Sequence, residues 1–193
     1  DVIAQAYANP VIADHYAERF VKPLCKVLAE YPDVVAMVAS TSEAENEMNE
    51  SQVGNQFGSD RDLYGVSQEN MLYFVNAVTE AVKKEFPAVP RTICCQLDDM
   101  SLYSEVDFDI LGDQNYNWAG RADAVEGFRP TVPMFGSEYG WGDNVTCTDA
   151  DLTKLQIAFR TNYRKEGYKG CVMWCWQPDS RSDSAYDLLK KGS

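Results

Sequence analysis

The sequence lacks several features that would indicate common classes of protein. Among its 193 residues it has a single histidine, His15, which excludes a histidine-dependent catalytic triad, and we expect this side chain to be solvated or to cap a helix. No apolar run approaches the ~18 residues of a membrane span, so no membrane partner is expected. With 30 acidic and 17 basic residues, the net charge of -13 repels phosphate backbones, so no nucleic acid partner is expected either.

Motifs for metal and nucleotide binding are also absent. The six cysteines have no CxxC spacing, which argues against a thiolate metal site, and we expect most of them to be buried thiols. No GxGxxG or GxxxxGK[ST] follows an expected strand, so neither a nucleotide nor any other cofactor is predicted. The sequon Asn144-Val145-Thr146 permits glycosylation and favours an extracellular location.

Apolar periodicity predicts alternating helices and strands along the chain. We expect helices over 14–30, from the cap Ser67 to 86, and from the cap Thr148 to the stop at Gly167. The first of these carries an apolar stripe that should face a sheet, formed by Tyr16, Phe20, Val21, Leu24, Val27 and Leu28. Pro23 should kink this helix or mark its true start. Strands are expected at 34–39, 91–97, 108–112, within 131–142, and at 170–176.

Alternating strands and helices of this kind indicate an α/β fold with a parallel sheet, either an open doubly wound sheet or part of a closed barrel. Because the nucleotide-binding motifs are missing, the sequence gives no support to an open doubly wound sheet. All four tryptophans lie at or just beyond the ends of the last three strands, at 118, 141, 174 and 176. In a parallel barrel those ends share the face where active sites form, and indoles beside carboxylates there are suited to stacking on sugar rings.

Four segments in order then match a known family. YPDVVAMVAS, FDILGDQNY, VPMFGSEYG and GCVMWCWQPD resemble the fourth, sixth, seventh and eighth strands of a clan A glycoside hydrolase, the retaining β-glycosidases of families such as 5 and 2. The resemblance implies a (β/α)8 TIM barrel, of which residues 1–193 would form one partial catalytic domain covering roughly strands 4 to 8. It also implies a carbohydrate substrate.

The resemblance assigns roles to individual residues. Glu138, at the end of the seventh-strand motif, would be the nucleophile, and Tyr116 would orient it. Trp174 would form the floor of the subsite for the reacting sugar, and Trp118, Trp141 and Trp176 would add further contacts to the substrate. Such enzymes place a second carboxyl about 5 to 5.5 Å from the first, as the acid/base.

Two residues compete for the acid/base role. The family's Asn-Glu pair matches Asn46-Glu47, which favours Glu47 and assigns Asn46 to the sugar 2-hydroxyl, whereas counting from Pro32 brings the register close to Glu43. If 43–49 were helical, Glu43 and Glu47 would share one face. The acid/base is therefore predicted as Glu47 or Glu43.

The resemblance further implies that the first three strands lie outside this chain. An open arc of five strands would expose apolar edges, so we expect the N-terminal part of the barrel to be supplied by the same or a second polypeptide. Two other interpretations stay open. One is a non-catalytic carbohydrate-binding relative. The other is a calcium site, against a simply solvated acidic loop, built from Glu43, Glu45, Glu47, Glu50, Asp98 and Asp99.

Overall fold

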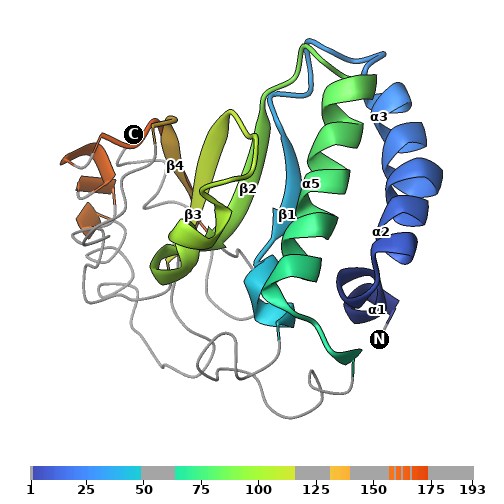
Figure 1. The fold of residues 1–193 in the computed structure, drawn as a ribbon. Helices are drawn as coiled ribbons and strands as arrows, with labels where there is room; N and C mark the ends of the chain where they lie inside the picture. The colour runs from blue at the N-terminus through green and yellow to red at the C-terminus, as the bar shows by residue number, and fades with distance from the viewer. Residues whose placement is uncertain are drawn as a thin grey trace, which may run out of the picture. The chain divides into compact units, whose positions relative to one another are not determined.

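The computed structural model describes residues 2–48, 64–115 and 131–139, and residues 157–173 apart from 159, 162 and 166. The chain divides into two compact units, Asp1–Leu111 and Gly112–Ser193. The elements, drawn in Figure 1, are α1 (Val2–Ala8), α2 (Pro10–Tyr16), η1 (Ala17–Val21), α3 (Lys22–Leu28), β1 (Val38–Ser42), η2 (Ala44–Glu47), α5 (Gln68–Glu85), β2 (Arg91–Gln96), η4 (Leu97–Tyr103), β3 (Ile110–Asn115), β4 (Met134–Tyr139) and β5 (Cys171–Met173).

Five strands form one sheet in the order β1-β2-β3-β4-β5, which is also their order along the chain. β1 pairs with β2 in parallel, and β4 pairs with β5 in parallel. This confirms the predicted α/β fold with a five-stranded parallel sheet. The assignment of these strands to positions 4 to 8 of a barrel stays a prediction.

In the first unit, α5 is the central helix (Figure 1), lying between β1 and the helices α1 to α3. It begins as predicted at Ser67, whose hydroxyl accepts a hydrogen bond from the Asn70 N–H at 3.2 Å. Its buried face is apolar and meets β1 and β2, and it includes Met71, Phe74, Val75, Val78 and Val82. The amphipathic helix predicted from Ser67 to residue 86 is therefore confirmed.

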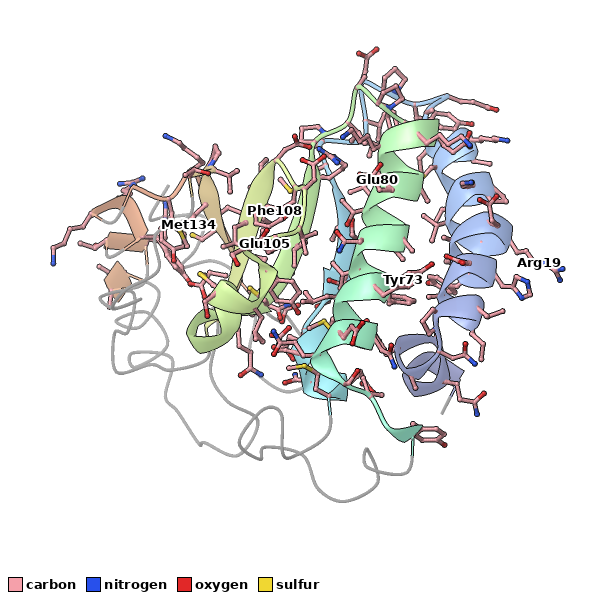
Figure 2. The ribbon with its side chains drawn as sticks, in the orientation of Figure 1. Arg19, Tyr73, Glu80, Glu105, Phe108 and Met134 are labelled. Atoms are coloured by element: carbon pink, nitrogen blue, oxygen red, sulfur yellow. The ribbon has the colours of Figure 1, made fainter. Side chains whose placement is uncertain are left out.

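The helix predicted at 14–30 exists as α2, η1 and α3, but the face assigned to its contact was only partly right, and its partner is α5 rather than the sheet. Tyr16, Phe20, Leu24 and Val27 are exposed, Phe20 by 53%. Val21 of the predicted stripe is buried together with Ala13, Ala17 and Cys25, and these three elements pack on α5. The Tyr16 ring also lies 5.5 Å from the ring of Phe74 in α5. Small side chains let two helices approach closely, which explains why the larger Phe20, Leu24 and Val27 lie outside this contact. Figure 2 shows Arg19 pointing away from α5.

Pro23 distorts this helix, as predicted. A proline lacks the N–H for an α-helical bond and its ring crowds the carbonyl four residues earlier. The five residues before Lys22 form a π-helical turn, η1, in which the Lys22 N–H reaches the Ala17 carbonyl. The wider turn relieves the clash without ending the helix.

Two strands start later than predicted. Val34 is 80% exposed and the N–H groups of Val34 and Val35 bond to the Tyr31 carbonyl, so the apolar run at 34–39 begins as a turn, and β1 occupies Val38–Ser42. β3 occupies Ile110–Asn115 rather than 108–112. In both cases the ladder extends into polar residues, because pairing with a neighbouring strand, rather than local hydrophobicity, fixes where a strand lies.

The second unit is held by aromatic packing beside β4 and β5. The rings of Tyr163 and Tyr168 lie 4.6 Å apart, and the Lys169 N–H donates to the Met134 carbonyl at 2.7 Å. Gly136 in β4 faces Tyr163 closely, since a Cβ built there would lie 2.7 Å from that ring. Gly167, predicted to stop the helix before β5, has a φ of 83°.

Candidate active site

Glu43 lies one residue beyond the end of β1. The β1–β2 register is interrupted between Ala39 and Thr41, which marks a bulge shortly before the strand ends. Glu43 has a φ of 49°, in the left-handed region that residues with a Cβ rarely adopt, and its N–H donates to the Cys94 carbonyl at 2.8 Å. Its side chain is half-buried. Such strain is held by surrounding contacts and is frequent at functional sites.

The turn after Glu43 brings Asn46 back to it. The Asn46 Nδ2 donates to Glu43 Oε2 at 2.7 Å, and the Gln96 Nε2 donates to Asn46 Oδ1 at 3.2 Å. The Gln96 bond fixes the orientation of the Asn46 amide, so that its N–H₂ group points to Glu43. Because Glu43 is left-handed and only 44–47 form the 3-10 helix η2, the conditional expectation of a helix over 43–49 with Glu43 and Glu47 on one face is wrong.

Glu45, in the middle of η2, is fully buried with 0% exposure. Its Oε1 accepts a hydrogen bond from the Gln96 N–H at 2.7 Å, and its Oε2 accepts one from the Tyr103 hydroxyl. The Glu45 N–H in turn donates to the Tyr103 oxygen at 3.2 Å. Glu45 is therefore not part of a solvated acidic loop, which corrects that interpretation for this residue.

The negative charge of this turn affects the pKa values of two tyrosines, Tyr103 and Tyr7. Burial raises the pKa of Tyr103, and the charge of Glu45 and its hydrogen bond raise this pKa further. Burial also raises the pKa of Tyr7, with smaller contributions from the charges of Glu47 and Glu45. Glu47 is half-buried and near enough to Tyr7 for this effect.

In the second unit, Glu138 is the penultimate residue of β4 and is half-buried. The β4–β5 register shifts between Gly136 and Tyr139, so a bulge includes the position of Glu138. Glu138 therefore lies near the carboxyl end of a strand, as predicted, and its role as the nucleophile stays a prediction.

Asp113 is the buried polar centre of this second unit. It has 0% exposure, its carbonyl accepts the Ser137 hydroxyl at 3.1 Å, and its Oδ2 accepts the Tyr168 hydroxyl at 3.3 Å. Burial raises the pKa of Tyr163, and the neighbouring charge of Asp113 adds to the increase. Gln114, also buried, follows it.

The structure describes only part of the predicted site. Glu43, Asn46 and Glu47 share one turn of the first unit, and Glu138 lies in the second. Several predictions lie outside the described residues: Tyr116, Trp118, Trp141, Trp174, Trp176 and the sequon at Asn144.

Sequence reasoning missed the roles of Glu45, Tyr103, Gln96 and Asp113. For Tyr103 no local signal existed, because its partner Glu45 is 58 positions away along the chain.

Among the described residues, no group of three or more histidine, cysteine, aspartate or glutamate side chains is arranged to hold a metal ion. In the same part of the chain, no helix combines the length and hydrophobicity that crossing a membrane requires.

Solved structures share this fold. No protein-family model and no curated protein matches the chain. The GH53 catalytic domain of Ignisphaera aggregans aligns with a TM-score of 0.56 and 15% identity, over 86% of this chain and 54% of that one. The virulence factor SghA, solved with its substrate analog salicin, aligns with a TM-score of 0.52 and 13% identity, over 88% and 59%.

These neighbours are TIM-barrel glycoside hydrolase domains, and identities this low establish a common fold only. The chain therefore has the fold of part of such a barrel, and it spans less than two thirds of the length of either structure.

Proposed function

We propose that this chain belongs to a retaining β-glycosidase that hydrolyses an oligosaccharide or polysaccharide with two glutamates. One observation carries the proposal: in a fold shared with glycoside hydrolase domains, half-buried glutamates lie at the carboxyl ends of β1 and β4, each beside a bulge. Carboxyl strand ends are where barrel enzymes carry their chemistry, and bulges there re-aim side chains.

Each carboxyl has a defined task in this reaction. A carboxylate oxygen of Glu138 attacks the anomeric carbon while the glycosidic C–O bond breaks and the acid/base gives its proton to the leaving oxygen. The acid/base then takes a proton from water, whose oxygen attacks the same carbon and releases Glu138. Two inversions retain the configuration of the sugar.

We place Glu43 first as the acid/base, with Glu47 as the alternative. Glu43 directly follows β1, and the Asn46 amide that accompanies the acid in the proposed family donates to Glu43 at 2.7 Å. Glu47, in contrast, lies near the buried phenol of Tyr7. Tyr116 is proposed to orient Glu138 beside the sugar, and Trp118, Trp141, Trp174 and Trp176 are proposed to hold the sugar rings by stacking.

The test is hydrolysis of an aryl β-glycoside by the wild-type protein and by Glu138→Gln, Glu43→Gln and Glu47→Gln. We expect Glu138→Gln and one of the other two to lose activity by at least ~10²-fold. Glu69→Gln, at an exposed position in the first turn of α5, is the matched control and should keep full activity. Proton NMR of the first product should show the retained anomer. Unchanged hydrolysis by Glu138→Gln would refute the proposal.

A non-catalytic carbohydrate-binding protein gives a different result. It would bind oligosaccharides in calorimetry, would hydrolyse none of them, and its affinity would not depend on Glu138. The same set of variants therefore separates the two functions.

We also propose that further strands, on the same or a second polypeptide, complete the barrel. The exposed apolar side chains of α2, η1 and α3 support this, because contiguous apolar surface usually marks an interface. Hydroxyl-radical footprinting of the complete protein should show Tyr16 and Phe20 protected relative to this chain alone. Equal labelling of both residues in the two samples would contradict the proposal.

A further inference from the structure

Glu45 is a fully buried carboxylate between two candidate acids. It has 0% exposure, and in the sequence it stands two residues from both Glu43 and Glu47. Residues two apart along the chain have Cα atoms within ~7 Å of one another, so a charge on Glu45 is near enough to act on Glu43.

The hydrogen bonds of Glu45 suit its ionised form. The Gln96 N–H can only donate, so Oε1 must accept. The Tyr103 oxygen already accepts the Glu45 N–H, which directs the tyrosine proton to Oε2. Both carboxylate oxygens therefore accept hydrogen bonds. Donors directed at both oxygens favour the charged form of a buried carboxyl.

Gln96 connects this carboxylate to the proposed acid. Its backbone N–H holds Glu45, while its side chain orients the Asn46 amide that donates to Glu43. A change at Glu45 therefore reaches Glu43 by two routes, through the fixed geometry of the turn and through space.

We propose that Glu45 is a positioning residue for the acid/base: its buried charge, held by Gln96 and Tyr103, fixes the turn and keeps the neighbouring acid protonated to higher pH. This inference rests on the proposed function. A general acid must carry its proton at the working pH, and a like charge nearby disfavours losing it.

Other groups around η2 are consistent with this effect. The charge of Glu45 contributes to raising the pKa of Tyr103 in η4 and of Tyr7 in α1. Cys95 of β2 also lies near Tyr103. The helix α5 packs on η2, and its buried residues, such as Met71 and Phe74, carry no charge. Glu69, in the first turn of α5, is exposed. Glu43, on the turn itself, is therefore the group whose pKa Glu45 is expected to shift.

The first experiment is the pH profile of aryl β-glycoside hydrolysis by the full chain with Glu45→Gln. This variant keeps the shape of the side chain and removes the charge. We expect kcat to fall while KM changes little, and the basic limb of the profile to move down by about one pH unit. The control is Asp109→Asn, which removes a carboxylate at the other end of β2 and should leave the limb in place.

Tyr103→Phe gives an independent variant if Glu45→Gln folds poorly. It keeps the ring and the Glu45 carboxyl but removes the hydroxyl that holds the charge, so the basic limb should move in the same direction by a smaller amount. If the basic limb of the pH profile stays in place in both variants, even with lower activity or stability, Glu45 has only a structural role and the inference is overturned.

NMR titration of carbon-13-labelled glutamate carboxyls separates this inference from the proposed function. The midpoint of Glu43 should be lower in Glu45→Gln than in the wild type. Absence of wild-type hydrolysis would refute the glycosidase while leaving this comparison valid. Identical midpoints in both proteins would overturn the role of Glu45 whether or not the chain is an enzyme.

Discussion

The two ends of β2 hold their charges in different ways. At the amino end, Arg91, which is 6% exposed, bonds through its guanidinium to Asp107 and Asp109, and Lys83 adds an ion pair to Asp107 at 2.6 Å. At the carboxyl end, the donors to Glu45 and Asn46 are neutral: the backbone and side chain of Gln96, and the Tyr103 hydroxyl. One end compensates charge with opposite charge, and the other holds it with dipoles.

This difference matches the division of labour in parallel barrels. Residues at the amino ends of barrel strands serve stability, and those at the carboxyl ends serve chemistry. A carboxylate paired with an arginine is locked in its ionised form, whereas one held by neutral donors can still exchange a proton or influence a neighbour that does. Substitutions at the two ends should therefore affect different measurements.

The largest expected effect is on activity, at the carboxyl end. Glu43→Gln should lower hydrolysis ~10² to 10⁴-fold, the usual contribution of a general acid, and leave the thermal midpoint nearly unchanged. Asp109→Asn should do the reverse, lowering the midpoint while hydrolysis per folded molecule persists. Enzyme assays and melting curves on both variants check this. Equal losses of activity in the two would remove the distinction between the ends.

The next effect is on stability, at the amino end. Arg91→Met keeps most of the buried apolar stem but leaves Asp107 and Asp109 without their shared partner. Removing one member of a buried pair is strongly destabilising, and because both aspartates are about half exposed we expect about 2 to 3 kcal/mol. Urea denaturation would measure the loss.

Lys83→Met is the control for this measurement, since Lys83 reaches Asp107 from a half-exposed position. It should destabilise clearly less than Arg91→Met. A loss as large as that of Arg91→Met would mean that burial of the arginine is not what matters.

The sequence predicted the elements better than it predicted their contacts. Ser67 and the periodicity after it located α5, and the run 91–97 located β2, because caps and patterns are local properties. Phe20 and Leu24, in contrast, were assigned to the buried face and are exposed. Which face of a helix is buried depends on the partner helix, here α5, and the partner is not encoded in the periodicity.

The candidate site was predictable to a similar degree. Glu138 and Glu43 could be identified as candidates because each lies at or just beyond the carboxyl end of a strand that the apolar pattern indicates. Glu45 was read as one acidic residue of a loop, and Tyr103 carried no signal at all. Their pairing depends on how η2 and η4 meet, which is a tertiary contact between residues 58 positions apart.

A smaller loss of stability is expected from the middle of a strand in the second unit. Gly136→Ala would place a Cβ 2.7 Å from the Tyr163 ring and 3.0 Å from Cys171 Cβ, so the ring must shift. Overpacking of this kind costs about 1 to 3 kcal/mol, and we expect about 2. Urea denaturation and the near-ultraviolet signal of the tyrosines would report it. Gly170→Ala, where a Cβ meets nothing within 4 Å, is the matched control.

The smallest effect is the acid dependence of the amino end. Hydrogen bonds from Lys83 and then Arg91 lower the pKa of Asp107, and the hydrogen bond from Arg91 lowers the pKa of Asp109. A carboxyl whose folded pKa is lowered contributes stability that is present above its unfolded pKa of about 3.9 and is lost as the pH falls through the folded value. Urea midpoints should therefore decrease below about pH 4.

The variant Arg91→Met tests the cause of this decrease. Without the guanidinium, the folded and unfolded pKa values of Asp109 should come closer together, so the decrease between about pH 4 and pH 2 should be shallower than in the wild type. Glu43→Gln, at the other end of the sheet, should leave the contribution of these two aspartates intact. Parallel curves for wild type and Arg91→Met would mean that the acid sensitivity arises elsewhere, and that the amino end is not where charge pairing stabilises the fold.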